Sequence, residues 1–308
     1  MYSIGIDIGG TTIKYGLVDD NNKIVARRVL TTTWPQEIKP IVDEFNEFLK
    51  ENNLTTKDID KVVAGCPGIV NSDKGTTTCP ALKWDDLPLR DILTKELKIK
   101  TEIHNDVNLA TAAEVKFGSG KGYKNAVMLT LGTGVGAGII INGEMYLGNQ
   151  GMGAEIGHMV IELNGTKCNC GRKGCFQAYA SALALKKQAI KALEKNKESS
   201  LYTAVGGDLE KINGEVIYKE LLKGDALAVK IVDKYVEYLS EGILNICNIL
   251  RPEVILLGGG ISNWEDVLTD KIKAYCQKEN YGYKNAPIVE IKIATLKNDA
   301  GILGCKAV

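Results

Sequence analysis

The first thirty residues alternate between short apolar runs and polar clusters, a pattern that predicts three strands joined by two tight turns. The strands are expected at 2–8, 13–18 and 23–30. The connections Gly9–Thr12 and Asp19–Asn22 are rich in the residues that turns prefer. Because no helical pattern separates the strands, we expect an antiparallel meander rather than the strand–loop–helix of a Rossmann or Walker-type site.

The same succession of elements returns after Gly118–Gly122, a glycine-rich segment that we predict to be a hinge. Strands are expected at 127–131, 138–141 and 145–147, and the glycine turn Gly132–Gly136 separates the first two. The two halves of the chain therefore share a structural repeat that is not a sequence repeat.

Apolar residues at helical spacing and short runs of core-type residues predict the remaining elements. The helices are expected at 36–52, 107–117, 177–195, 226–250, 264–277 and 299–306, and the strands at 62–64, 101–104, 253–257 and 288–294. Together with the hinge, these elements predict an N-terminal α/β domain of residues 1–117 plus 298–308 and a larger C-terminal α/β domain of residues 118–297.

Composition narrows the class of protein. The 308 residues are 44% hydrophobic and 25% charged, as in soluble globular proteins. Lys+Arg and Asp+Glu are both 38, so no excess positive charge is available for nucleic acid or an anionic membrane. No signal peptide pattern and no apolar run of membrane-spanning length is present. Eight cysteines without an export signal indicate reduced thiols, and we expect a cytoplasmic protein.

Four potential metal ligands lie close together in the stretch 153–177: His158, Cys168, Cys170 and Cys175. Three thiolates and an imidazole form the ligand set of a closed tetrahedral zinc site, with no open position for a catalytic water. The alternative is a set of ordinary thiols in a loop, but the other five cysteines are scattered along the chain. We therefore predict a structural zinc, which also fixes the backbone near Glu155.

Glycine and threonine recur in both predicted hairpin turns, DIGGTT (7–12) and LGTGVG (131–136). Glycine lets backbone N–H groups turn inward to form an anion nest, and threonine adds hydroxyl donors. Two such turns at equivalent places suggest a nucleotide in a cleft between the halves, with Asp7 able to hold Mg²⁺ through its waters. The candidate nucleotide contacts are Gly9, Gly10, Thr11, Thr12, Lys14, Gly132, Thr133, Gly134, Gly136, Gly258, Gly259 and Gly260.

Asp106 stands where a predicted strand ends and a predicted helix begins. An aspartate at this place commonly caps the helix, and for Asp106 taken alone that interpretation is favoured. Beside two phosphate-binding turns it becomes a candidate general base that accepts the proton of an attacking hydroxyl. The helix N-terminus would keep it ionised. Asn105, Glu155 and His158 could complete a pocket for a hydroxyl-rich ligand.

Several motifs together resemble the ROK family of bacterial sugar kinases and related repressors, and most closely its kinases that act on glucose. They are DIGGTTIKYGLVD (7–19), HND (104–106), LGTGVGAGI (131–139), GAEIGHM (153–159), CNCGRKGCFQ (168–177) and LLGGGIS (256–262). The resemblance spans nearly the whole chain. It implies two ribonuclease-H-like α/β domains of the actin–hexokinase type, with ATP and sugar in the interdomain cleft.

The resemblance also implies roles for single residues. Asp106 would be the general base, and Asn105, Glu155 and His158 would hold sugar hydroxyls, His158 serving both metal and sugar through different ring nitrogens. Pro67 and Gly68 would line the same pocket. Family members are often dimers or tetramers, so we expect a homodimer or homotetramer.

Three positions depart from the family pattern and bear on the choice of sugar. Gln177 stands where the kinases usually have Glu, Ala81 where those acting on glucose often have Asn, and Thr12 where many members have Lys. None of them touches the expected base. The sequence therefore predicts phosphorylation of a hexose C6 hydroxyl, most readily that of glucose, with N-acylhexosamines such as N-acetylmannosamine or β-glucosides as alternatives.

A sugar-sensing regulator of the same family is the non-enzymatic alternative. Such a repressor carries an additional N-terminal DNA-binding segment, whereas here the first predicted strand begins at Tyr2. Asp106 and both phosphate-binding turns are present. The sequence thus favours the enzyme.

Overall fold

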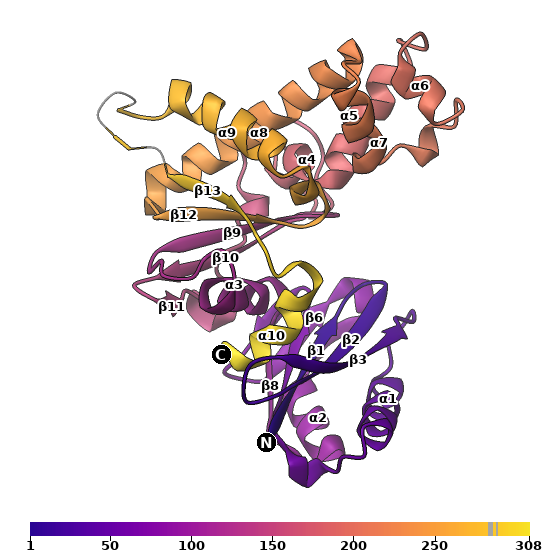
Figure 1. The fold of residues 1–308 in the computed structure, drawn as a ribbon, viewed down its shortest axis with the longest axis vertical. Helices are drawn as coiled ribbons and strands as arrows, with labels where there is room; N and C mark the ends of the chain where they lie inside the picture. Colours follow the sequence, from indigo (N-terminus) through magenta and orange to yellow (C-terminus); the bar gives the residue numbers. More distant parts are fainter. Residues whose placement is uncertain (283–285, 288) are drawn as a thin grey trace. The chain divides into compact units, whose positions relative to one another are not determined.

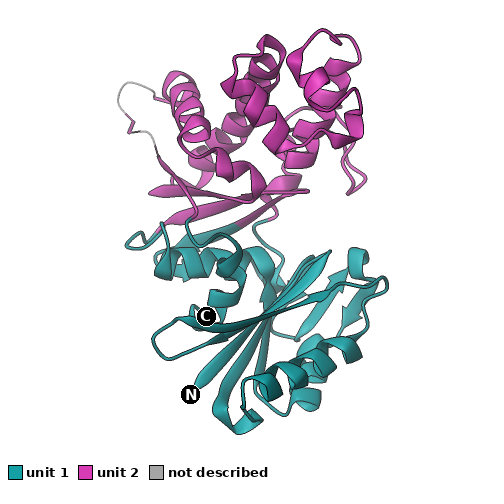
Figure 2. Ribbon diagram, turned by 45° about the vertical axis from the view of Figure 1, so that its right-hand side comes forward, with its two compact units in different colours: residues 1–124, 138–154, 295–308 teal, residues 125–137, 155–294 magenta. Residues whose placement is uncertain are grey.

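The computed structural model describes residues 1–282, 286–287 and 289–308 (Figure 1). The chain forms two compact units, shown in Figure 2: unit 1 consists of residues 1–124, 138–154 and 295–308, and unit 2 of residues 125–137 and 155–294. The chain first leaves unit 1 after residue 124, near the predicted hinge, comes back for residues 138–154 and returns for the last time at residue 295. The predicted domain bounds at 117/118 and 297/298 stay a prediction.

Unit 1 is built on a five-stranded sheet in the order β3-β2-β1-β4-β8. β1 is antiparallel to β2, and β2 to β3, which confirms the predicted meander; β1 pairs in parallel with β4, and β4 with β8. The strands are β1 (Tyr2–Ile8), β2 (Thr12–Val18), β3 (Ile24–Thr31), β4 (Ile59–Cys66) and β8 (Thr101–Asn105).

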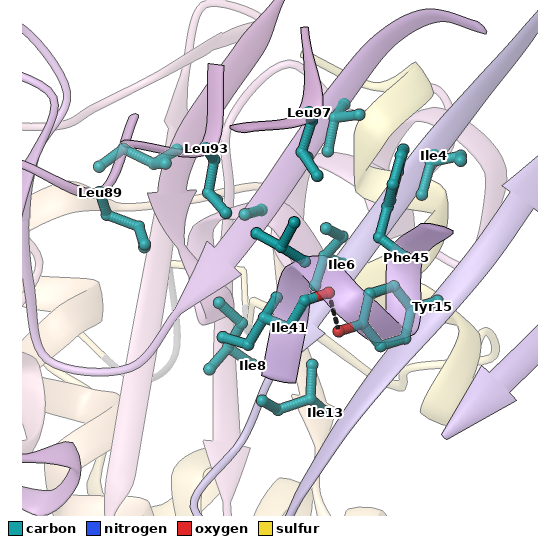
Figure 3. Close-up of a cluster of buried hydrophobic side chains, with 14 of the residues drawn as sticks. Ile4, Ile6, Ile8, Ile13, Tyr15, Ile41, Phe45, Leu89, Leu93 and Leu97 are labelled. Atoms are coloured by element: carbon teal, nitrogen blue, oxygen red, sulfur yellow. Dashed lines mark hydrogen bonds between the residues drawn. The ribbon is translucent and has the colours of Figure 1, made fainter. Parts of the chain in front are cut away.

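The core of unit 1 lies between this sheet and the helices α1 (Ile38–Glu51) and α2 (Leu89–Leu97) (Figure 3). Alternate residues of β1 and one face of each helix supply its side chains, as the periods of strand and helix require. The phenol of Tyr15 is buried there and donates a hydrogen bond to the carbonyl of Ile41 at 3.0 Å. Fully buried members are Ile4, Ile6, Ile8, Ile13, Phe45, Leu89 and Leu93.

A small three-stranded sheet in unit 1 was not predicted from the sequence. It consists of β5 (Ile69–Asn71), β6 (Thr76–Cys79) and β7 (Trp84–Leu87) in the order β5-β6-β7. Its anchor is Trp84, which is buried and whose indole N–H donates to the carbonyl of Gln36 at 2.8 Å. The strands are too short for a clear alternating pattern, so only tertiary contacts identify them.

The second five-stranded sheet repeats the order of the first: β11-β10-β9-β12-β13. β12 is parallel to β9 and to β13, and β10 is antiparallel to β11, so the predicted repeat of the two halves is confirmed. The strands are β9 (Ala126–Leu131), β10 (Val135–Ile141), β11 (Glu144–Met145), β12 (Val254–Gly258) and β13 (Glu290–Ile293). Residue 288, with which the last predicted strand began, lies outside the described residues.

The turn predicted at Gly132–Gly136 included two residues that belong to a strand. β10 begins at Val135, so only Gly132–Gly134 form the turn and Gly136 lies within a strand. Val135 is buried and β-branched, a combination that favours the sheet over the turn.

Most of the remaining chain of unit 2 is helical. Its helices are α4 (Gln177–Ala180), α5 (Ala182–Leu193), α6 (Ser200–Ala204), α7 (Gly214–Leu222), α8 (Ala226–Leu250) and α9 (Asp266–Glu279). The helix predicted at 226–250 is confirmed, but the single helix predicted at 177–195 was wrong. Ser181 has an extended backbone and its hydroxyl accepts from the amide of Ala184 at 3.0 Å, so it ends α4 and caps α5.

The second face of the first sheet is covered by α3 (Asp106–Phe117) and α10 (Ala300–Leu303). Residues 299–306, predicted as one helix, form α10 flanked by 3-10 turns. No helix in the described part of the chain is long and apolar enough to cross a membrane.

Glu114 of α3 is fully buried, and its carboxylate links Ser119, shortly before the chain first leaves unit 1, to residues 295–296, where the chain returns for the last time. One oxygen accepts from the amide of Leu296 at 2.6 Å, and the other from the amide of Ser119 at 3.0 Å and from the hydroxyl of Thr295 at 3.4 Å. A buried carboxylate of this kind stabilises the fold only while hydrogen-bond donors are paired with it.

We therefore expect Glu114→Ala to lower the free energy of unfolding by about 2–4 kcal/mol, because two backbone amides lose their acceptor in the interior. Glu114→Gln, which keeps one acceptor, should cost less. Urea denaturation measures both variants. Glu96→Ala, an exposed glutamate on α2, is the control and should stay within about 0.5 kcal/mol of the native protein. Equal stability of Glu114→Ala and the control would contradict this role.

Candidate functional site

The four predicted metal ligands come together in unit 2. The donor atoms of His158, Cys168, Cys170 and Cys175 all lie within 4.8 Å of one another. The Sγ of Cys168 is 3.8 Å from Nδ1 of His158, and the Sγ atoms of Cys170 and Cys175 are 3.7 Å apart. A tetrahedral zinc with Zn–S bonds of about 2.3 Å separates its sulfur ligands by about 3.8 Å. The donor set and its spacing therefore fit zinc.

Backbone hydrogen bonds and glycines fold the loop around these ligands. The amide of Cys168 donates to the carbonyl of Arg172 at 2.8 Å, which turns the chain back on itself. Gly174 has φ +80°, and a Cβ at this position would collide with the carbonyl oxygen of Glu162. Only glycine fits both conditions, so the turn that presents Cys175 depends on it.

Without a metal ion, the pKa values of two thiols in the cluster are shifted in opposite directions. Burial disfavours the thiolate of Cys168, yet hydrogen bonds from the backbone of Cys170 and from the amide of Gln177 lower its pKa to about 6. Burial and the neighbouring thiols raise the pKa of Cys175 to about 12. A divalent cation would remove this conflict, since it stabilises several thiolates at once.

Gln177 contacts the metal-ligand loop with one end of its carboxamide and the start of β10 with the other. Its Nε2 donates to Oδ1 of Asn169 at 2.7 Å and to Sγ of Cys168 at 3.2 Å, and its Oε1 accepts weakly from the amide of Val135 at 3.4 Å. Gln177 is the first residue of the short helix α4, which ends at the break at Ser181. Sequence reasoning missed the contribution of Asn169, which no spacing rule would have indicated.

Glu155 and His158 are joined by a single 3-10 turn. The amide of His158 donates to the carbonyl of Glu155 at 3.0 Å, and the side chain of Glu155 is exposed. Unit 2 thus brings His158, Gln177 and the cysteines into one cluster, with Glu155 one turn away.

In unit 1, Asn105 ends β8 and caps α3. Its Oδ1 accepts from the amides of Val107 at 3.0 Å and Asn108 at 3.1 Å, and its Nδ2 donates to the carbonyl of Gly68 at 3.2 Å. Gly68, at φ +86°, follows Pro67 in the rigid turn after β4. The structure therefore brings Asn105, Asp106 and the Pro67–Gly68 turn together.

Asp106 is the first residue of α3 and not its cap. One of its carboxylate oxygens accepts from the amide of Val107 at 2.9 Å, and the side chain is half-buried. The cap of α3 is therefore Asn105, and not Asp106 as the sequence taken alone favoured.

The first glycine–threonine turn is closed by a backbone bond from Gly9 to Thr12 at 2.9 Å. Thr32, directly after β3, holds the turn through its hydroxyl, which donates to the carbonyl of Gly9 at 2.7 Å. Sequence reasoning missed Thr32, which is distant along the chain. Asp7, five residues before Thr12, lies 3.4 Å from Nζ of Lys14 and is partly exposed, so a hydrated cation fits its carboxylate.

The second turn is held in the same way within unit 2. The amide of Gly132 donates to the carbonyl of Gly134 at 3.1 Å, and the amide of Ala182 donates to the carbonyl of Gly132 at 2.8 Å. Gly259 has φ +85°, and a Cβ there would lie 2.6 Å from the carbonyl oxygen of Leu131. Gly258–Gly260 therefore packs directly against the strand that leads into Gly132.

The predicted cleft, in which residues of both units would meet one nucleotide and one sugar, stays a prediction. Within unit 1 the structure collects Asp7, the Gly9–Thr12 turn and Lys14 at one end of the β1–β2 hairpin, and Asp106 with Asn105 and Gly68 at the ends of β4 and β8.

Comparison with known proteins identifies relatives along the whole chain. The family model described as the ROK family matches residues 3–308. A glucokinase of Halalkalibacterium halodurans is 35% identical over 311 residues, covering 98% of this chain and 92% of the relative.

Two solved structures show the same fold. The ROK family glucokinase of Streptomyces griseus, in complex with glucose and AMPPNP, has a TM-score of 0.86 at 29% identity and covers 99% of this chain and 98% of that one. A putative N-acetylmannosamine kinase of Listeria monocytogenes has a TM-score of 0.81 at 28% identity, covering 99% of this chain and 97% of that one. The predicted α/β fold and family are confirmed.

Proposed function

Because the chain belongs to the ROK family, we propose that it is an ATP-dependent hexose kinase acting on the C6 hydroxyl, with glucose as its first substrate. The observation that carries this proposal is the 35% identity to a glucokinase over 98% of the chain. The fold shared with a glucokinase that binds glucose and AMPPNP supports it.

In this proposal unit 1 supplies the base. The C6 oxygen attacks the γ-phosphorus of ATP, the bond from that phosphorus to the bridging oxygen of ADP breaks, and Asp106 accepts the hydroxyl proton. Asn105 holds a sugar hydroxyl, and its hydrogen bond to Gly68 fixes its orientation. Pro67 and Gly68 line the same pocket.

The glycine–threonine turns would hold the phosphates through backbone amides. Gly9, Gly10, Thr11, Thr12 and Lys14 belong to the first turn, and Gly132, Thr133 and Gly134 to the second; Gly258–Gly260 supports the latter. A bound Mg²⁺ would neutralise charge on the phosphates, and Asp7 is the carboxylate placed to hold it through water.

Unit 2 would hold the far end of the sugar with Glu155, His158 and Gln177. The zinc fixes the loop that presents them and has no open position for chemistry. His158 would face zinc with Nδ1, the nitrogen nearer Cys168, and the sugar with Nε2.

The assembly, location and partners of the protein are part of the same proposal. We expect a cytoplasmic homodimer or homotetramer that binds neither nucleic acid nor membrane. Sedimentation equilibrium measures the assembly, and a filter-binding assay with duplex DNA tests the regulator alternative.

The proposed activity is tested with purified protein, Mg-ATP and a panel of hexoses, with ADP release as the readout. We expect turnover with glucose and lower or comparable turnover with N-acetylmannosamine, the alternative that the Listeria relative suggests. ADP release that does not depend on any added sugar would reject the hexose kinase.

Gln177 should influence which sugars are used. Its amide donates to Asn169 and Cys168, whereas a glutamate could only accept. We expect Gln177→Glu to change the ratio of kcat/KM for glucose, N-acetylmannosamine and a β-glucoside by about two- to tenfold, the worth of one neutral hydrogen bond. Gln277→Glu, an exposed glutamine on α9, is the matched control and should leave the ratios unchanged. Unchanged ratios in Gln177→Glu would exclude this residue from sugar selection.

A further inference from the structure

A groove of about 1030 Å³ in unit 2 is lined mainly by residues of α5 and α8. These two helices, labelled in Figure 1, pack against each other. Its lining includes the buried residues Ala184, Ile231 and Tyr179. None of the residues of the proposed kinase site lines this groove. Its volume is at the upper end of small-molecule sites, which run to about 1000 Å³.

Lysines from both helices edge this groove. Lys187 and Lys191 lie four residues apart on α5 and Lys195 follows the end of that helix, while Lys230 and Lys234 lie four apart on α8. Residues four apart share one face of a helix, so the lysines form two rows along the groove.

The positive charge of the groove is largely uncompensated. Five lysines stand against two carboxylates, Glu198 and Asp225, in a protein whose total charge is zero. Asp225 caps α8: its carboxylate accepts from the amide of Ala228 at 2.7 Å and from the hydroxyl of Ser199 at 2.9 Å.

Of the five lysines, Lys234 is paired with Glu237 at 2.8 Å. Lys187, Lys191, Lys195 and Lys230 form no ion pair with any residue that the structure describes. Like charges four residues apart destabilise a helix, so these rows carry a cost that an anionic ligand would remove.

The charge and the size of the groove define the occupant. A phosphate monoester carries about −1.5 to −2 charges at neutral pH. Two phosphate groups, with about −3 to −4 charges together, therefore match the excess of three positive charges among the lining residues. Tyr179 and Tyr238 also line the groove, with ring centroids 4.5 Å apart, and offer contact to a non-polar part of the ligand.

We propose that the groove between α5 and α8 binds a small molecule carrying two or more phosphate groups. The site is separate from the proposed kinase site, and its test requires no turnover. The phosphates contact the two lysine rows, and the ligand lies over Tyr179, whose hydroxyl accepts a hydrogen bond from the amide of Thr166 in the metal-ligand loop.

The test is calorimetric titration of the full-length native protein with two probes, fructose 1,6-bisphosphate and inorganic tripolyphosphate, at about 0.15 M salt. The groove variant is Lys187→Gln, Lys191→Gln and Lys230→Gln combined. The charge-matched control combines Lys57→Gln, Lys95→Gln and Lys273→Gln, three exposed lysines outside the groove. All three proteins keep the same nucleotide turns, so binding of a probe at those turns cannot separate them.

We expect the native protein and the control to bind with equal Kd, and the groove variant to bind at least about 100-fold more weakly, since each charge-assisted contact is worth roughly tenfold. Without ligand, the groove variant should melt no lower than the native protein, because the repulsion within the rows is relieved. If the groove variant loses only tripolyphosphate binding, the site takes inorganic phosphate chains. If it loses only fructose 1,6-bisphosphate binding, the site takes organic phosphates. The proposal is overturned if the groove variant binds the probes as tightly as the control, or if the native protein binds neither.

Discussion

Asp106→Asn is expected to lower kcat for glucose by about 10²–10⁴-fold, the usual contribution of a general base, while glucose and ATP still bind. The amide has nearly the same shape but cannot accept the hydroxyl proton. The fold should survive the change, because Asn105 makes the two capping hydrogen bonds to Val107 and Asn108. The loss should therefore appear in kcat with little change in the Kd of either substrate.

Steady-state kinetics measures the loss in kcat, and calorimetric titration with glucose measures the Kd. Asp91→Asn is the matched control, since Asp91 also lies in the first turn of a helix, α2, and is exposed. It should leave kcat unchanged. Near-native turnover in Asp106→Asn would remove this residue from the mechanism, and loss of glucose binding together with turnover would assign it to binding.

Cys175→Ser is expected to release the zinc and to lower kcat/KM for sugar by at least about 10–100-fold, because weaker perturbations of metal sites already have effects of that size. Cys175 is fully buried and its Sγ lies 3.7 Å from that of Cys170, so a serine leaves the cluster with two thiolates and one imidazole. Without the metal, the loop no longer fixes His158, Glu155 and the partners of Gln177. The loss should fall mainly on KM.

Metal analysis of chelator-free protein and kinetics with glucose test this expectation. Cys276→Ser makes the same chemical change at another buried thiol, which lies on α9. Burial raises the pKa of this thiol to about 12. This control should keep a single zinc per chain and native kinetics. Native protein without zinc, or full sugar affinity in metal-free Cys175→Ser, would contradict a structural zinc.

Regular periodicity made much of the fold predictable. The period of two in the first thirty residues locates β1, β2 and β3 within one residue or so, and the long apolar stripe of 226–250 gives α8 in full. The recurrence of strand, turn and strand predicts the repeat with which both halves of the chain begin. In these segments the local pattern and the tertiary contacts favour the same structure.

Elements fixed by single contacts could not be predicted. Ser181 lies within a continuous helical pattern, and only its hydrogen bond to Ala184 shows that α4 and α5 are separate. The strands β5–β7 depend on contacts such as that of Trp84 with Gln36, which are distant along the chain. In the candidate site, the metal ligands could be predicted from their residue types and spacing. The cap at Asn105 and the hydrogen bond from Thr32 to Gly9 could not, because only the folded structure shows them.

The most direct test of the proposed activity follows the fate of the transferred phosphate. Native protein and Asp106→Asn are each incubated with Mg-ATP and glucose, and phosphorus NMR records the products. The kinase proposal predicts that ADP and a single phosphate monoester on C6 of glucose accumulate together in the native sample, with almost none in the variant. A native sample that forms no sugar phosphate, a monoester at another carbon, or equal rates in the two samples would contradict it.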